Sequence, residues 1–326
     1  MKVVVLCAGL GTRLKPITDQ LPKPLVPILN QPLLEIAMRQ LTRAGFTEFA
    51  VNAYHLHEKI ADFAGKRSLP GQPPIYVSLE LPNVLGTGGA LGPLKPWISN
   101  EPFLVYNGDI LSDLDFSALW SHHKSHQNMV TMSVMPNYTG KDRAIWVETK
   151  AGRNMVRAIA KEKPAPRWGH EVTPYQFACS YAVTSEFLKY IPERHFFDVI
   201  DAFNQALEDG YSIEAVLHDG YWADVGSPAS LWKTHKDIMA LPSSKRSELV
   251  CAPLELNLAF GGQTVLGTQS EIGAGVSCEG VVIIGERAKI GPGCQLKNCL
   301  IFPDTSIAGG VLVENKIVGP GFEIKL

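Results

Sequence analysis

The chain has 326 residues, of which 45% are hydrophobic and 19% are charged, and its formal net charge is -2. This length suits about two domains, and the balanced charge argues against a nucleic-acid binder, which usually carries a basic patch. The cysteines are scattered without a CxxC pair, which predicts free thiols. The sequence opens with no cleavable leader and holds no apolar run of about 18 residues. We therefore expect a cytoplasmic protein that binds neither nucleic acid nor membranes.

Residues 1–240 alternate short apolar runs with segments of helical periodicity. The predicted strands are Val3–Ala8, Phe49–Ala53, Ile75–Leu79 and Phe103–Tyr106, and the predicted helices are Leu33–Ala44, Ala118–Ser125 and Val199–Leu207. Such alternation predicts an α/β domain with a Rossmann-like, mixed but mostly parallel sheet, covered by helices on both faces. Ligands of these sheets bind beyond the carboxyl ends of the strands. The loops after the first and fourth predicted strands are therefore the first places to look for a site.

The periodicity changes after residues 241–262, a polar and turn-prone stretch that we interpret as a linker. One apolar row recurs every sixth residue: Leu266, Ile272, Cys278, Ile284, Ile290, Leu296 and Phe302. A second row has the same period: Val276, Val282, Ala288, Cys294 and Leu300. A parallel β-helix of hexapeptides has this period, whereas a helix or an ordinary strand does not. We expect residues 263–326 to form a left-handed parallel β-helix that loses its phase after Phe302, with an irregular β-sandwich as the alternative.

A glycine-containing loop follows the first predicted strand and reads Ala8-Gly9-Leu10-Gly11-Thr12-Arg13. Glycines let backbone N–H groups approach an anion closely. The spacing matches neither a dinucleotide fingerprint nor a Walker loop, so phosphate binding and a plain strand-to-helix turn both stay open. Ten residues further on, Lys23 stands between two prolines in a stiff segment. It is either a surface lysine or one that is held toward a phosphate.

Together, residues 8–13, 16–18 and 22–25 resemble the opening motif of the sugar nucleotidylyltransferase family: Ala-Gly-x-Gly-Thr-Arg, Pro-x-Thr and Pro-Lys-Pro-Leu. That family joins a nucleoside triphosphate to a sugar 1-phosphate and releases pyrophosphate. The resemblance implies that Arg13 and Lys23 contact the phosphates and the departing pyrophosphate. It also implies that the strand end and the loop bind the nucleotide through Leu6, Ala8, Gly9, Gly11 and Thr12.

Two aspartates stand where predicted strands end, in Asn107-Gly108-Asp109 and in Trp222-Ala223-Asp224. Alone, the first sequence is more often a turn, and a carboxylate in the apolar setting of the second needs a partner. Both stretches resemble the metal-binding segments of the family. The resemblance implies one Mg²⁺ held by Asp109, Asp224 and phosphate oxygens, and Mg²⁺ commonly keeps only a few protein ligands.

The segment Lys161-Glu162-Lys163-Pro164 is by itself a charged, solvated loop. The family carries Glu-Lys-Pro here, which implies that Glu162 binds sugar hydroxyls and that Lys163 binds the sugar phosphate, with Asn107 on the same side. Cys179 stands where the family usually has glycine. This departure leaves the identity of the sugar open.

Glu80 and the sequence Leu85-Gly86-Thr87-Gly88-Gly89 resemble the base-proximal loop of guanylyl-transferring members. The resemblance implies nucleotide contacts by Thr87 and Gly88, and it favours GTP and mannose 1-phosphate. A uridylyl- or thymidylyltransferase acting on another hexose 1-phosphate is the alternative. A non-catalytic regulatory homologue is a further alternative, although such homologues tend to lose the arginine, the lysine or an aspartate.

The six-residue repeat also suits an acyltransferase, but that chemistry generally uses a histidine, and none follows His235. We therefore expect the β-helix to serve oligomerisation or regulation in a homo-oligomer. His57 and Glu58 begin like a zinc-protease helix, but Ala61 replaces the second ligand. His122 and His126 lie four residues apart on a predicted helix, yet nothing nearby completes a site. We expect neither pair to bind a metal.

Overall fold

The computed structural model describes residues 1–67, 74–140, 142–163, 171–252, 256–257 and 259–326. The chain divides into two compact units, Met1–Leu10 with Gln40–Trp222, and Gly11–Arg39 with Ala223–Leu326. Within the described ranges, no helix is both long enough and apolar enough to cross a membrane.

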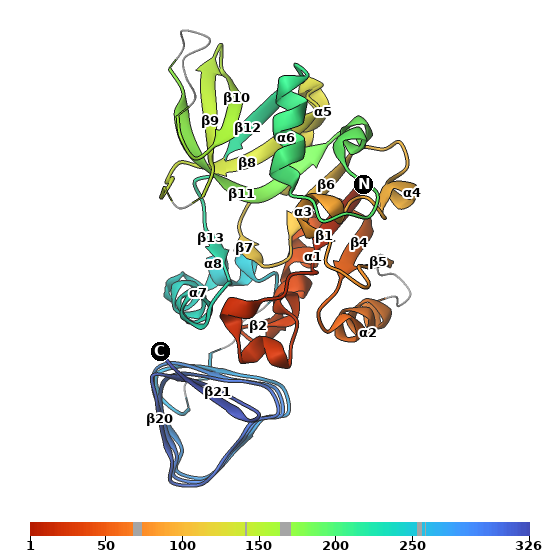
Figure 1. The fold of residues 1–326 in the computed structure, drawn as a ribbon. Helices are drawn as coiled ribbons and strands as arrows, with labels where there is room; N and C mark the ends of the chain where they lie inside the picture. Colours follow the sequence, from red (N-terminus) through yellow and green to blue (C-terminus); the bar gives the residue numbers. More distant parts are fainter. Residues whose placement is uncertain (68–73, 141, 164–170, 253–255, 258) are drawn as a thin grey trace. The chain divides into compact units, whose positions relative to one another are not determined.

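The first unit is built on one sheet with the strand order β5-β4-β1-β6-β11-β8-β12-β10-β9 (Figure 1). Its strands are β1 (Lys2–Leu6), β4 (Glu48–Ala53), β5 (Ile75–Leu79), β6 (Phe103–Asn107), β8 (Val130–Met135), β9 (Ala144–Lys150), β10 (Arg153–Ala160), β11 (Thr173–Val183) and β12 (Ile213–Leu217). The short strand β7 (Ile110–Ser112) follows β6. All four strands predicted from the sequence are present.

The sheet is mixed, as expected, but parallel pairing does not predominate throughout it. Strands β5, β4, β1 and β6 pair in parallel. Beyond β6 the pairings are antiparallel except for β8 with β12. Part of this antiparallel pairing has a local cause. Ala151 and Gly152, both at positive φ, join β9 directly to β10. A tight turn of this kind can join only antiparallel strands, whereas a parallel pair needs a long crossover.

Helices α5 and α6 cover opposite faces of this sheet. The helices of the first unit are α2 (His57–Arg67), α3 (Gly86–Gly89), α4 (Lys95–Ile98), α5 (Phe116–His126) and α6 (Val199–Glu208), with the 3-10 helix η4 (Ser185–Tyr190). On α5, His123 Nδ1 lies 3.0 Å from the hydroxyl of Thr131. On α6, the ring of Phe203 lies 5.1 Å from the ring of Tyr181, whose strand partner is Met132. Neighbouring strand residues point to opposite faces, so the two helices enclose the sheet between them.

The second unit begins with the short 3-10 helices η1 (Thr12–Leu14), η2 (Ile17–Asp19) and η3 (Lys23–Leu25), followed by β2 (Pro27–Ile28) and β3 (Gln31–Pro32). Helix α1 (Leu33–Arg43) leads from this unit into the first, and β13 (Trp222–Asp224) leads back. Helices α7 (Pro228–Ala240) and α8 (Ser243–Leu249) follow. Helix α8 lies inside the stretch interpreted as a linker. Its lysine, arginine, glutamate and leucine are good helix formers, which explains why this polar stretch is helical.

The C-terminal strands form stacked coils with three sides, which Figure 1 shows end-on in blue. They are β14 (Gln263–Leu266), β15 (Glu271–Ile272), β16 (Ser277–Ile284), β17 (Lys289–Ile290), β18 (Gln295–Ile301), β19 (Ser306–Ile307), β20 (Leu312–Glu314), β21 (Lys316–Gly319) and β22 (Phe322–Lys325). Gln263 pairs in parallel with Val281, eighteen residues ahead, so one coil holds three hexapeptides. A Cβ at Gly267 would lie 2.3 Å from the backbone nitrogen of Glu286, and only glycine permits this spacing.

The six-residue repeat shifts by one residue instead of ending at Phe302. Up to Leu296, the interior side chains follow the two expected rows. At Asn298, which has a φ of 43°, the pairing of β16 with β18 skips a residue. The interior row then continues through Ile301, Ile307 and Val313. Strand β18 has one residue fewer than β16 at this point, so each following residue takes the place of the next one in the repeat. Leu300 and Phe302 therefore lie outside the interior cluster, and Cys299 and Ile301 lie inside it.

A buried histidine connects α7 to the turn between β2 and β3 in the second unit. His235 Nε2 accepts a hydrogen bond from the backbone N–H of Leu29 at 3.2 Å, and Nδ1 donates to the carbonyl of Leu231 at 2.9 Å. This pairing requires a neutral imidazole with its proton on Nδ1. Burial lowers the pKa of His235 to about 4, although the bond to Leu231 opposes this shift.

The depressed pKa predicts that His235 contributes to the loss of stability in acid. The neutral His235 contributes its full stabilisation of the folded state above the unfolded pKa near 6.5. This stabilisation decreases as the pH falls toward 4, because the unfolded state binds the proton at a higher pH than the folded state. Between pH 8 and pH 5 we expect a loss of about 2 kcal/mol from this residue. Urea midpoints of the native protein and of His235→Gln at the two pH values check the prediction. An equal pH dependence in both proteins would contradict it.

Candidate functional site

The carboxyl ends of β1 and β6 lie next to each other in the first unit. Leu6 pairs with Asn107, and the backbone N–H of Gly108 donates to the carbonyl of Leu6 at 2.9 Å. A Cβ at Gly108 would lie 2.9 Å from that oxygen, so a side chain would disturb the turn that leads to Asp109. Burial, and next the negative charge of Asp109, raise the pKa of the Cys7 thiol, which follows β1. The structure thus brings the predicted residues Leu6, Asn107 and Asp109 together.

A buried hydrogen-bond chain connects the start of the glycine loop to the segment before α3. The backbone N–H of Cys7 donates to Asn52 Oδ1 at 2.5 Å, and Asn52 Nδ2 donates to Glu80 Oε1 at 2.7 Å. Glu80 Oε2 accepts from the backbone N–H of Leu85 at 2.7 Å. Burial raises the pKa of Glu80, and its two hydrogen bonds partly offset the shift. Sequence reasoning missed Asn52, whose only signal is a lone amide in the apolar run of β4.

Helix α3 packs tightly on residues 195–199. The backbone N–H of Gly88 donates to the carbonyl of Phe197 at 2.9 Å, and a Cβ at Gly88 would lie 2.8 Å from the Phe197 ring. Thr87 Oγ1 donates to Asp198 Oδ1 and accepts from the backbone N–H of Val199, both at 3.1 Å. The Gly-Thr-Gly-Gly sequence therefore has a packing role at the start of α6. This role is separate from the nucleotide contacts expected of Thr87 and Gly88.

In the second unit, Arg13, Lys23 and Asp224 form one group, which we call the Asp224 cluster. Lys23 Nζ lies 3.0 Å from Asp224 Oδ1, and the lysine side chain is only 8% exposed. Arg13 Nη2 lies 3.5 Å from Asp224 Oδ2, and the arginine side chain is 72% exposed. A Cβ at Gly226 would lie 2.8 Å from Arg13 Nη2, so this glycine leaves room for the pair. The structure thus unites both predicted phosphate-binding cations with one predicted metal ligand.

The loop that carries Thr12 and Arg13 is fixed from inside the second unit. Gly11 has a φ of 61°, and Thr18 Oγ1 donates to its carbonyl at 2.8 Å. A Cβ at Gly11 would lie 2.7 Å from the Thr18 methyl group. In the first unit, the neighbouring Ala8 is buried, and a Cβ at Gly9 would meet no described atom within 4 Å. The glycines thus differ in role, because Gly11 permits a left-handed turn and Gly9 leaves open space.

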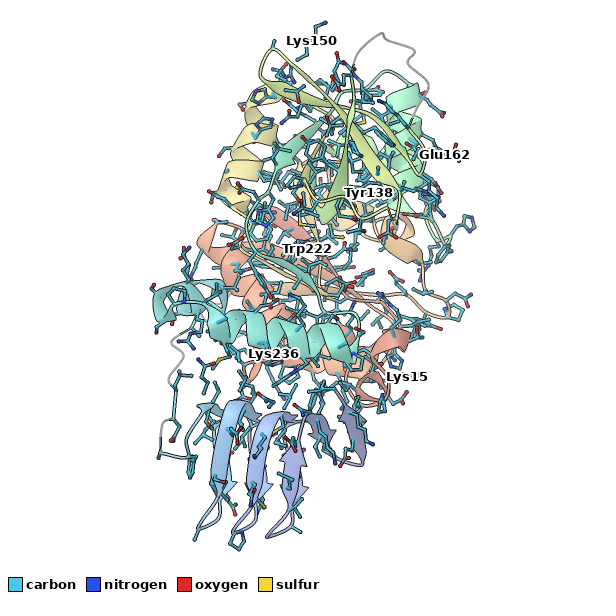
Figure 2. All side chains as sticks on the ribbon, turned by 90° about the vertical axis from the view of Figure 1, so that its left-hand side faces the viewer. Lys15, Tyr138, Lys150, Glu162, Trp222 and Lys236 are labelled. Carbon is cyan, nitrogen blue, oxygen red and sulfur yellow. The ribbon has the colours of Figure 1, made fainter. Side chains whose placement is uncertain are left out.

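The predicted sugar-phosphate residues Glu162 and Lys163 follow β10 and are exposed. Glu162 is labelled in Figure 2. Gly152 lies in the turn that joins β9 to the antiparallel β10. The prolines of the same motif, at positions 164 and 166, lie outside the described residues.

Cys179 occupies an irregular point of β11. Its φ is 60°, in the left-handed region that favours glycine, and the pairing of β11 with β8 shifts between Phe177 and Tyr181. Trp222 Nε1 donates to the carbonyl of Ala178 at 3.1 Å, which helps to hold the irregularity. The conformation explains why glycine suits this position.

We expect Cys179→Gly to stabilise the protein by about 1 kcal/mol, because glycine adopts this φ without steric cost. Ala178→Gly is the matched control, since Ala178 lies outside the left-handed region. The control should lose about 0.5–1 kcal/mol, because glycine adds entropy to the unfolded chain. Urea denaturation of both variants provides the measurement, and a stability loss in Cys179→Gly equal to that of the control would contradict the strain argument.

Comparisons with known proteins assign the chain to a family. The nucleotidyl transferase family profile matches residues 2–240, and the chain belongs to this family. A second profile, the GMPPB C-terminal domain, matches residues 260–325.

Individual relatives cover nearly the whole chain. A UTP–glucose-1-phosphate uridylyltransferase of Synechocystis sp. is 26% identical, over 98% of this chain and 87% of its own. A mannose-1-phosphate guanylyltransferase of Mycobacterium tuberculosis is 27% identical, over 95% of this chain and 82% of its own. The solved structure of a UDP-glucose pyrophosphorylase from Acinetobacter baumannii has the same fold. It has a TM-score of 0.62 and 19% identity, and it covers 77% of this chain and 95% of its own.

Proposed function

We propose that this chain transfers a nucleotidyl group from a nucleoside triphosphate to a sugar 1-phosphate. The observation that carries the proposal is the Asp224 cluster, in which two cations meet beside the glycine loop of a nucleotidyl transferase. A phosphate oxygen of the sugar phosphate bonds to the α-phosphorus, and the bond from that phosphorus to the bridging oxygen of the β-phosphate breaks. Pyrophosphate leaves with that oxygen. The attacking phosphate is already ionised, so the reaction needs no general base.

Positioning and charge neutralisation dominate this kind of transfer. Lys23 is buried and held by Asp224, which suits a fixed contact to the triphosphate, whereas the exposed Arg13 suits a contact that forms when the substrate arrives. We assign the sugar phosphate to Lys163 and Asn107 and the sugar hydroxyls to Glu162. We assign the nucleotide to Leu6, Ala8, Gly9, Gly11, Thr12, Thr87 and Gly88.

We further propose that Asp109 and Asp224 bind Mg²⁺. Carboxylate oxygens are the protein ligands that this hard cation takes. The two oxygens of Asp224 face Lys23 and Arg13, so the ion would share this carboxylate with both side chains. When bound, the ion would polarise the phosphate oxygens and favour in-line geometry.

GTP and mannose 1-phosphate are the substrates that we favour. The match to the GMPPB C-terminal domain and the guanylyltransferase of M. tuberculosis support this choice. UTP with glucose 1-phosphate is the second candidate, because the Synechocystis relative carries that activity in its name over the same length of chain.

We also propose that the C-terminal coils are a left-handed β-helix through which copies of the chain associate. Their parallel coils of three hexapeptides support the β-helix. The exposed apolar side chains of Val311 and Leu312 on these coils support association.

The reaction is tested by pyrophosphate release from each nucleoside triphosphate with a panel of sugar 1-phosphates in the presence of Mg²⁺. We expect turnover with one pair and a loss of about 100-fold or more in kcat/KM for Lys23→Ala and for Asp109→Ala, because each removes charge stabilisation that the transition state needs. Lys233→Ala is the matched control, since it breaks a lysine–aspartate pair on the exposed face of α7. This control should keep its activity.

If no pair reacts while nucleotide sugars still bind, the chain is a regulatory homologue and the catalytic proposal is wrong. Chelation by EDTA tests the metal separately. Activity that persists unchanged in EDTA would refute the Mg²⁺ assignment alone.

A further inference from the structure

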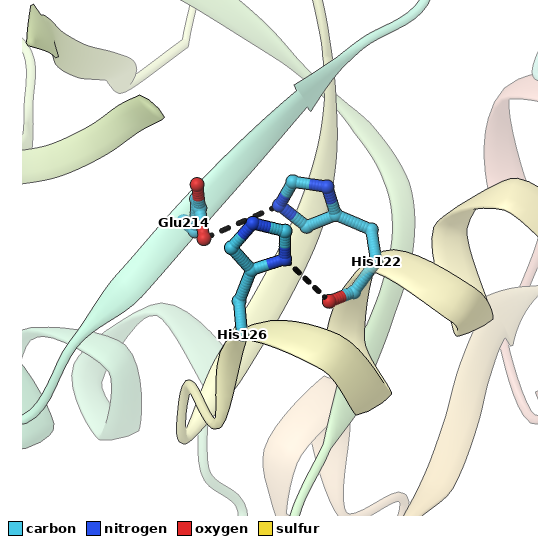
Figure 3. A group of neighbouring side chains, drawn as sticks. All are labelled: His122, His126 and Glu214. Carbon is cyan, nitrogen blue, oxygen red and sulfur yellow. Dashed lines mark hydrogen bonds and ion pairs between the residues drawn. The ribbon is translucent and has the colours of Figure 1, made fainter. Parts of the chain in front are cut away.

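Two histidines of α5 meet a buried glutamate of β12 within the first unit (Figure 3). His122 and His126 lie one turn apart near the end of the helix, and Glu214 reaches them from the strand. The sequence-based expectation did not include Glu214, which lies beside these histidines. The missing partner is distant in the chain and becomes a neighbour only through the packing of α5 near β12.

The distances between the three side chains suit a small metal ion. His122 Nε2 lies 3.2 Å from Glu214 Oε2, but without the alignment of a hydrogen bond. Tetrahedral zinc with bonds of roughly 2.0–2.1 Å places its ligand atoms about 3.3 Å apart. The two imidazole rings are stacked with centroids 4.1 Å apart, and one ligand atom from each of the three residues lies within 4.8 Å of the others. Small rotations of the rings would close this set around one ion.

Hydrogen bonding leaves a ring nitrogen of His126 available to a metal. Nδ1 of His126 lies 3.0 Å from the backbone carbonyl of His122 and 2.9 Å from Ser125 Oγ, and Ser125 donates its own proton to that carbonyl. Both neighbours of Nδ1 therefore act as acceptors, which places the proton on Nδ1. The lone pair is then on Nε2, which Figure 3 shows turned toward Glu214 and the His122 ring. Metal-binding histidines are commonly oriented in this way, by a bond from the second nitrogen to a carbonyl.

The carboxylate is held in place by Asn128 and Arg153, which both donate to Oε2, the oxygen that faces His122. Asn128 Nδ2 lies 2.5 Å from Glu214 Oε2, and Arg153 donates to both carboxylate oxygens, at 3.2 and 3.0 Å. Burial raises the pKa of Glu214, but the hydrogen bonds from Arg153 and Asn128 outweigh burial and lower the pKa to about 2. The guanidinium charge of Arg153 opposes a nearby cation, so we expect weaker binding than at an unpaired carboxylate.

We propose that His122, His126 and Glu214 form a binding site for a divalent transition metal ion, and that the ion is zinc. Two imidazoles and one carboxylate are a zinc ligand set that leaves a fourth position for water. The His122 side chain is 29% exposed, so an ion has access from solvent, whereas the Glu214 side chain is 1% exposed and fixes the inner side. The ion would join the last turn of α5 to the central sheet. This proposal is independent of nucleotidyl transfer.

The test is zinc titration of the full chain, free of any affinity tag and pretreated with EDTA, in buffer that contains excess Mg²⁺. Calorimetry should show one more zinc equivalent in the native protein than in the double variant His122→Asn with His126→Asn. We expect the affinity of this site for zinc to be lower by about 100-fold or more in the double variant than in the native protein. Saturating zinc should also raise the melting temperature of the native protein by about 5 °C.

His57→Asn is the matched control. The exposure of His57, 28%, is close to that of His122, and His57 also lies beside a glutamate, at 3.4 Å from Glu58. Among the described residues, however, no third ligand accompanies it. This control should keep the full zinc stoichiometry. Cobalt in place of zinc should give the visible absorption of a four-coordinate ion in the native protein and in the control, and not in the double variant.

Equal zinc stoichiometry and affinity in the native protein and in the double variant would overturn the proposal. The single variant His126→Asn guards against a folding defect, since this side chain is partly exposed at the end of α5. Its circular dichroism should match that of the native protein while the zinc equivalent is lost. Retention of that equivalent in the folded single variant would equally refute the assignment.

Discussion

The pairing of Lys23 with Asp224 is the interaction on which the loop structure of the second unit depends. A buried ammonium is costly unless an opposite charge and hydrogen bonds compensate for it. Lys23 is almost fully buried between prolines, and Asp224 supplies the compensating charge at 3.0 Å. Removing Asp224 would take this opposite charge away from the buried lysine, whereas removing Lys23 would leave the carboxylate with Arg13. The same carboxylate reaches Arg13, so one side chain positions both cations that the proposed reaction uses.

The backbone around Lys23 and Asp224 holds the loop in position. Gly226 leaves space beside Arg13, and Ser227 then begins α7 with a capping box that it shares with Ser230. A capped helix start fixes the direction in which the chain leaves β13. At the other end of the loop, Thr18 holds the carbonyl of Gly11. The loop is therefore defined by hydrogen bonds within the second unit before any substrate binds.

The first unit uses polar groups in a different way. Asn52 and Glu80 link the ends of β1, β4 and β5 to the segment before α3, so the strand ends are joined by side chains as well as by the sheet. Buried polar groups of this kind are stable only when each has a partner. The group of His122, His126 and Glu214 on the same sheet follows the same rule, with Asn128 and Arg153 as partners of the carboxylate.

The sequence by itself determined the features that depend on neighbouring residues. The apolar runs and helical periods located β1, β4, β5, β6, α1, α5 and α6, and the six-residue repeat located the C-terminal coils. Tertiary structure decided what depends on distant partners. It placed Glu214 beside His122, Asn52 beside Cys7 and Asp224 between two cations, and it made the second half of the sheet largely antiparallel. The physical reason is that periodicity records which face of an element is buried, whereas the partner of a buried polar group is set by packing between segments far apart in the chain.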